Sequence, residues 1–237
     1  TDYLNKSAEL LQGKSDKLLL FDILLMKGRL MQNQEQYDSA RQYINEALKL
    51  SLASNSRSAL AKAFLSFGVL EFRQNNFAEA EINLTNAYNT LKNTTDKVNL
   101  IKICNSLGDT FVGQERFADA EHIYLEGLEL SHELGHSYYL ERLNYKLSRL
   151  FKMQNKNKLA THHDEQAYRY ARQLNRDKIQ TNLFNSQMDY EEVVRTQEIN
   201  RLNEKYTSIS NIQSIIIVTA SVIIVLLIIV FIIHYRY

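Results

Sequence analysis

Apolar residues recur along most of the chain at the spacing of an amphipathic helix. In the segment that holds Phe64, Phe67 and Leu70, the apolar positions lie three residues apart, so they share one face of a helix. Polar stretches such as Asn75-Asn76 separate these segments. Proline is absent and glycine occurs only seven times, so residues that favour tight turns are scarce. The pattern therefore predicts helices joined by short polar loops.

The same pattern returns every forty residues. The first three copies hold a small residue, an aromatic residue nine positions later, and two further small residues three and ten positions after the aromatic; the fourth has Asn157 in place of the aromatic residue. These positions are Gly28, Gly68 and Gly108, with Ser148 in the fourth copy; Tyr37, Phe77 and Phe117; Ala40, Ala80, Ala120 and Ala160; and Ala47, Ala87, Gly127 and Ala167. Small residues let two packed helices approach closely. Because one helical pair cannot bury its own apolar face, we expect neighbouring pairs to stack.

This spacing of glycine, aromatic and alanine resembles the tetratricopeptide repeat, most closely in the segments around Gly68 and Gly108. The resemblance implies an all-α solenoid of helical hairpins. Its forty-residue form is similar to the sensor region of bacterial membrane-anchored regulators and histidine kinases. We expect four repeats at about 14–55, 56–95, 96–135 and 136–175, the fourth divergent because it lacks the glycine and the aromatic residue.

The repeat register also extends towards the start of the chain. Projected backwards, it places Leu4 at the position of Ile44 and Ser7 at the position of Ala47. We therefore expect residues 1–13 to form the second helix of a truncated repeat, and the sequence to be a fragment of a longer protein.

Residues 176–213 contain no glycine, which predicts a capping and juxtamembrane helix. Ile199, Leu202, Tyr206 and Ile209 are spaced three, four and three residues apart, which is typical of a short coiled-coil seam and indicates a homodimer. A solvated helix that only caps the last repeat is the alternative.

An uncharged, almost wholly apolar run of nineteen residues extends from Ile215 to Ile233. A helix of this length reaches about 28 Å, close to the thickness of the hydrocarbon core of a bilayer. The run predicts a single transmembrane helix at 214–234, followed by an interfacial tail at 235–237. The flanking charges do not fix its orientation. The resemblance favours repeats in the bacterial periplasm, anchored in the inner membrane. Cytoplasmic repeats are the alternative.

Overall charge and candidate reactive groups narrow the function further. Lys and Arg number 28 against 27 Asp and Glu, so we expect no nucleic-acid partner, which would require a positive surplus. The single cysteine, Cys104, falls at an inward helix position and is expected to pack rather than react. His162 and His163 are expected to be surface residues.

His132, Glu133 and His136 match the H-E-x-x-H pattern of zinc proteases. The match falls where forty-residue repeats commonly end in Glu-Leu-Gly, which makes chance the simpler explanation. We therefore expect neither a metal nor another cofactor, and no enzyme activity.

In the repeat family, side chains of the first helices line a concave groove. By register these are Asp22, Leu25, Arg29 and Gln32; Lys62, Leu65, Val69, Phe72 and Arg73; Lys102, Asn105, Asp109 and Val112; and Arg142, Tyr145, Arg149 and Lys152. Seven are basic and two acidic, which favours an extended peptide that carries acidic groups or a free carboxylate. A merely solvated charged face is the alternative.

These observations predict a membrane-anchored protein-binding or sensor module, the input part of a signal-transduction regulator. A tail-anchored scaffold, recruiting partners to a membrane from the cytosolic side, is the alternative.

Overall fold

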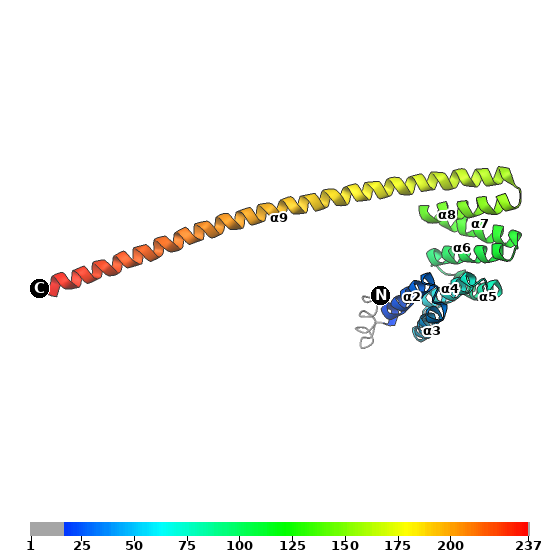
Figure 1. Ribbon diagram of the computed structural model, residues 1–237, viewed down its shortest axis with the longest axis horizontal. Helices are drawn as coiled ribbons and strands as arrows, with labels where there is room; N and C mark the ends of the chain where they lie inside the picture. Colours follow the sequence, from blue (N-terminus) through cyan, green and yellow to red (C-terminus); the bar gives the residue numbers. More distant parts are fainter. Residues whose placement is uncertain (1–16, 237) are drawn as a thin grey trace. The chain divides into compact units, whose positions relative to one another are not determined.

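The computed structural model describes residues 17–236, and every regular element within that range is a helix. The eight helices are α2 (Lys17–Asn33), α3 (Tyr37–Ala53), α4 (Arg57–Arg73), α5 (Phe77–Leu91), α6 (Lys97–Gly113), α7 (Phe117–Glu133), α8 (Ser137–Met153) and α9 (Asn157–Arg236) (Figure 1). The predicted all-α helical solenoid is confirmed. Residues 1–13, the expected truncated repeat, lie outside the described residues, as does Tyr237.

The helices pack as hairpins whose first members also contact one another. The pairs α2–α3, α4–α5 and α6–α7 are in contact, and so are α2–α4, α4–α6 and α6–α8. Contacts between alternate helices place the first helices of successive hairpins in one layer of the solenoid. The repeat glycines lie at the contacts within the hairpins, where Gly28 faces Ile44 and Gly68 faces Leu84.

Most helices end in the same tight turn, which explains the short loops. The second residue after the helix has a left-handed backbone, as in Asn75 (φ 61°) and Gly135 (φ 61°). The next amide donates back to the last turn, for example Asn76 N to the carbonyl of Glu71 at 2.9 Å. These bonds satisfy carbonyls that the helix end would leave unpaired. Asparagine and glycine tolerate this backbone better than most residues, so the polar loops suit their conformation.

The small residues of the repeat are needed because the paired helices approach closely. Ala40, Ala80 and Ala120 are fully buried. A Cβ atom added at Gly68 would lie 2.7 Å from Cδ2 of Leu84, closer than packed carbon atoms approach. Ser148 takes the place of this glycine in the fourth hairpin, and it is buried as well.

Two compact units divide the chain at 175/176, and α9 contributes to both. Its first residues complete the fourth hairpin with α8. The helix continues through the boundary that we expected between the last repeat and a separate capping helix, since no glycine or proline interrupts it.

The second unit holds the residues expected to dimerise and to cross a membrane. The seam residues Ile199, Leu202, Tyr206 and Ile209 are all exposed. A search of the described part of the chain identifies no helix with both the length and the apolar character that a bilayer crossing requires. Many side chains of the run 215–233 lie outside the described residues.

Candidate functional site

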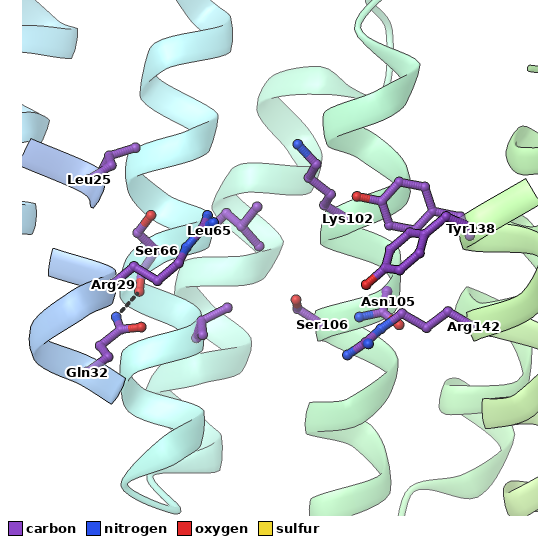
Figure 2. A pocket seen from close by; sticks show the side chains of 12 residues that line it. Leu25, Arg29, Gln32, Leu65, Ser66, Lys102, Asn105, Ser106, Tyr138 and Arg142 are labelled. Carbon is purple, nitrogen blue, oxygen red and sulfur yellow. Dashed lines mark hydrogen bonds between the residues drawn. The ribbon is translucent and has the colours of Figure 1, made fainter. Parts of the chain in front are cut away.

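A cavity of about 230 Å³ opens between the first helices of all four hairpins (Figure 2). We call it the cationic pocket. Its lining residues are Leu25, Arg29 and Gln32 of α2; Leu65, Ser66 and Val69 of α4; Lys102, Asn105 and Ser106 of α6; and Tyr138, Tyr139 and Arg142 of α8. Figure 2 shows Arg29 extending from one wall and Lys102 and Arg142 from the opposite wall.

Three positive side chains converge on this pocket from three different helices. Burial lowers the pKa of Lys102, and repulsion by Lys62 and Arg29 lowers it further, while Asp96 acts in the opposite sense. Among the described residues, neither Arg29 nor Arg142 forms an ion pair. Like charges held together are stabilised by an anion between them. The pocket is therefore suited to a negatively charged group.

Asn105 adds a polar group with an unmet hydrogen-bonding need. Its side chain is 8% exposed, and its Oδ1 has no hydrogen-bond partner among the described residues. A buried acceptor without a partner costs about 1–3 kcal/mol. The neighbouring Gln32 differs, since its Nε2 donates to the carbonyl of Ser66 at 3.4 Å. Asn105 is thus placed to bind a polar ligand group after a small adjustment of its amide.

Two tyrosines of α8 form the aromatic part of the pocket. The rings of Tyr138 and Tyr139 meet edge to face, with centroids 5.1 Å apart. Burial raises the pKa of Tyr139, as does Tyr138, whereas Arg142 and Arg29 lower it. Arg29 of α2 and Arg142 of α8 line the same cavity, so the pocket brings the first and the fourth hairpin together.

A second cavity, of about 320 Å³, lies further along the first helices α4, α6 and α8. We call it the apolar pocket. Its lining residues are Phe72 and Phe77; Asp109, Val112 and Gly113; Tyr124; and Tyr145, Lys146, Arg149, Leu150 and Met153. Asp109 forms an ion pair with Lys146 and accepts a hydrogen bond from the hydroxyl of Tyr124. Arg149 also lines this pocket and forms no ion pair among the described residues. Most of the other lining residues are aromatic or aliphatic.

The predicted groove residues lie in three places: the cationic pocket, the apolar pocket, and positions outside both. Leu25, Arg29, Gln32, Leu65, Val69, Lys102, Asn105 and Arg142 line the cationic pocket, and Phe72, Asp109, Val112, Tyr145 and Arg149 line the apolar pocket. The other four are engaged elsewhere: Lys62 lies 3.4 Å from Asp22, Arg73 donates to the carbonyl of Gln32, and Lys152 pairs with Asp164. Part of the positive excess that we counted is therefore neutralised.

Several lining residues were not expected from the repeat register. Ser66, Ser106, Tyr138 and Tyr139 line the cationic pocket. Tyr138 and Tyr139 occupy the first turn of α8, one turn before the positions carried over from the family. The aromatic pair at the start of this helix was the one signal in the sequence that could have indicated them.

The histidine pattern adopts a geometry different from that of a zinc-protease helix. The helix α7 ends at Glu133, and Gly135 has a left-handed backbone, so His136 lies beyond the helix that carries His132. Glu133 pairs with Lys97 of α6. The pattern therefore does not place two imidazoles one helical turn apart, which is the arrangement that such a site needs.

His163 is not a surface residue, which corrects the expectation from the sequence. Its side chain is 9% exposed and stacks on Phe151, and its Nδ1 lies 2.8 Å from Oδ1 of Asn144. Burial and the neighbouring His162 lower its pKa. Position 163 falls on the face of α9 that packs against α8, whereas His162 is exposed.

Cys104 is fully buried in a core cluster that residues of α4, α5, α6 and α7 form, and burial raises the pKa of its thiol. Since the thiolate is the reactive form, we expect Cys104 to resist alkylation by iodoacetamide at neutral pH in the folded protein. The thiol should react completely once denaturant unfolds the chain. Mass spectrometry of both samples measures this difference. Rapid modification of the folded protein would contradict a packing role.

Comparison with known proteins supports a tetratricopeptide-repeat protein. The family model described as Tetratricopeptide repeat matches residues 21–53, which hold most of α2 and all of α3. No significant match to a curated protein sequence was found.

Solved structures resemble the fold at low sequence identity. BtubC from P. vanneervenii aligns with a TM-score of 0.62 and 18% identity over 73% of this chain and 72% of that one. The Rap conjugation gene regulator of plasmid pLS20, solved with the Phr peptide, aligns with a TM-score of 0.55 and 19% identity over 66% of this chain and 44% of the regulator. A signal-transduction ATPase with a tetratricopeptide-repeat sensor from Pyrococcus horikoshii gives 0.62 and 15% identity, over 76% and 28%.

The helical fold and these likenesses together define the fold class: an α-helical solenoid of stacked helical hairpins. This chain spans less than half of the Rap regulator and of the ATPase.

Proposed function

We propose that this chain is a non-enzymatic module that binds an extended peptide through a carboxylate held in the cationic pocket. The observation that carries the proposal is the convergence of Arg29, Lys102 and Arg142 on one cavity, beside the unpaired amide oxygen of Asn105. Guanidinium groups bind carboxylates through paired hydrogen bonds. A peptide amide could donate to Asn105. The similar Rap regulator was solved with a peptide, which supports the same class of ligand.

The experiment uses the full chain in detergent and a library of octapeptides made of alanine, glycine and serine. Each peptide is prepared with a free C-terminal carboxylate, as a C-terminal amide, and as an amide with one internal glutamate. We expect the peptides that carry a carboxylate to bind about tenfold tighter or more than the neutral amides, since hydrogen bonds to charged groups are the stronger ones. Comparison of the free acids with the amides that contain glutamate shows whether the pocket prefers a C-terminal or a side-chain carboxylate. Equal binding of all three sets would refute the proposal.

The same proposal places the module at a membrane, where it acts as the input part of a signal-transduction regulator. Its support is the uncharged run Ile215–Ile233, which is long enough to cross a bilayer as a helix. In bacteria the anchor would lie in the inner membrane with the repeats in the periplasm. Two copies anchored in one bilayer have parallel helices, so the seam of Ile199, Leu202, Tyr206 and Ile209 would pair them in register.

Expression in bacteria tests the anchor and its orientation. The full chain should stay with the membrane fraction after alkaline washing, and a variant that lacks residues 215–233 should not. Externally added protease should digest the repeats in spheroplasts if they face the periplasm. Protection of the repeats would favour the tail-anchored scaffold with cytoplasmic repeats. Release of the full chain by the alkaline wash would refute membrane anchoring altogether.

A further inference from the structure

The apolar pocket continues the cationic pocket along the three helices that both pockets share, α4, α6 and α8. On α6 the cationic pocket involves Lys102 to Ser106, and the apolar pocket involves Asp109 to Gly113, seven positions further on. On α4, Val69 lines the first and Phe72 the second. Seven helical residues advance about 10 Å. A ligand that leaves one pocket along the groove therefore reaches the other within a few residues.

The chemistry of the second pocket differs from that of the first. The charge of Asp109 is already matched by Lys146, and the hydroxyl of Tyr124 completes its hydrogen bonding. Two large side chains at the rim, Tyr145 and Met153, are 49% and 53% exposed. Exposed apolar surface around a hollow is typical of a binding site. Met153 adapts its shape easily, so the pocket can accept an aromatic or a branched aliphatic side chain.

We infer that the apolar pocket takes a large apolar side chain of the same peptide whose carboxylate occupies the cationic pocket, two to four residues away. An extended peptide advances about 3.3 Å per residue, so a separation of about 10 Å corresponds to three residues. The centres of the two linings lie about five positions apart on α4 and about nine positions apart on α8, distances of about 8 and 13 Å that correspond to two and four peptide residues. This inference rests on the proposed function, and it adds a sequence requirement to the ligand: a carboxylate and an apolar residue at fixed spacing.

The test walks one leucine through the octapeptides described above, from one to six residues away from the carboxylate. Binding to the full chain is measured by calorimetry for the free acids and for the amides with internal glutamate, the latter with leucine on either side. We expect affinity to peak at a spacing of two to four residues. The peak should exceed the leucine-free peptide by about ten- to a hundredfold, the gain that complete burial of such a side chain gives.

Variants of the two exposed rim residues assign the effect to this pocket. Tyr145→Asp and Met153→Asp should remove the gain from leucine, measured within each variant as the ratio of the affinities for carboxylate peptides with and without leucine. The matched controls Leu52→Asp and Ile82→Asp change apolar side chains that are somewhat more exposed and line neither pocket, and they should keep the gain. Because all four side chains are exposed, folding should tolerate each change.

The outcomes separate this inference from the proposed function. If carboxylate peptides bind but leucine has no preferred position, or if the aspartate variants keep the gain in affinity from leucine, only the apolar subsite is refuted. If no carboxylate peptide binds better than its neutral amide, both the proposed function and the apolar subsite are refuted.

Discussion

Replacing Arg29 or Arg142 with glutamate is expected to weaken the binding of carboxylate peptides by about a hundredfold or more. Removal of one partner of a desolvated charge pair costs about 2–5 kcal/mol, and a glutamate adds repulsion of the ligand. Both arginines line the cationic pocket, from opposite walls, so either reversal alters the same binding volume (Figure 2). Neither arginine forms an ion pair among the described residues that the change would break, so both variants should fold.

Calorimetric titration with one free-acid octapeptide measures the effect. Lys49→Glu is the matched control, because Lys49 is an exposed cation on α3 that lines neither pocket. The control should bind within about twofold of the unchanged protein, and the affinity of the unchanged protein should fall as salt is added. Wild-type affinity in both arginine variants would show that the cations do not hold the ligand.

Substituting Gly108 by alanine is expected to destabilise the solenoid by about 1–3 kcal/mol, the usual cost of overpacking a core. A Cβ atom there would lie 2.8 Å from Cζ of Tyr124, with two other ring atoms nearer still. The ring cannot easily move away, since Tyr124 is 1% exposed and its hydroxyl donates to Asp109. Within an exposed helix the same change would stabilise by about 1 kcal/mol, so the sign of the effect is diagnostic.

Thermal unfolding of the full chain, followed by far-UV circular dichroism, provides the measurement. Gly28→Ala serves as the comparison, because its added Cβ would lie 3.0 Å from Cγ1 of Ile44, a flexible aliphatic group. We expect its melting temperature to fall much less than that of Gly108→Ala. The reverse order, or a rise in the Gly108 variant, would mean that the hairpin can open to admit a methyl group.

The helices and their pairing could be predicted from the sequence because both depend on local chemistry. Apolar spacing defines the buried face of each helix, and polar triplets such as Gln34 to Gln36 stand where the helices end. The alanines at repeat positions such as Ala80 and Ala120 are buried as the forty-residue pattern indicates. The coiled-coil seam and the membrane span stay predictions.

The candidate site could be predicted only in part, because register does not state which positions of different repeats meet. Arg29 shares its repeat position with Val69 and Asp109, yet Asp109 lines the apolar pocket instead. Lys102 and Arg142 share the position of Asp22, which lines neither pocket. Each hairpin is displaced relative to the one before it. The residues that line the cationic pocket therefore stand earlier in the repeat on each later first helix.

By itself the sequence determined the all-α solenoid, the hairpins and the candidate layer of first helices, since helical period and small-residue packing act within one repeat. Only the tertiary structure decided which charges remain available. It pairs Lys62 with Asp22 and Lys152 with Asp164, while Arg29 and Arg142 meet across a cavity. It also decided that His163 packs inside. These outcomes depend on the rotation between stacked hairpins, a geometric quantity that side-chain packing sets and that no repeat length records.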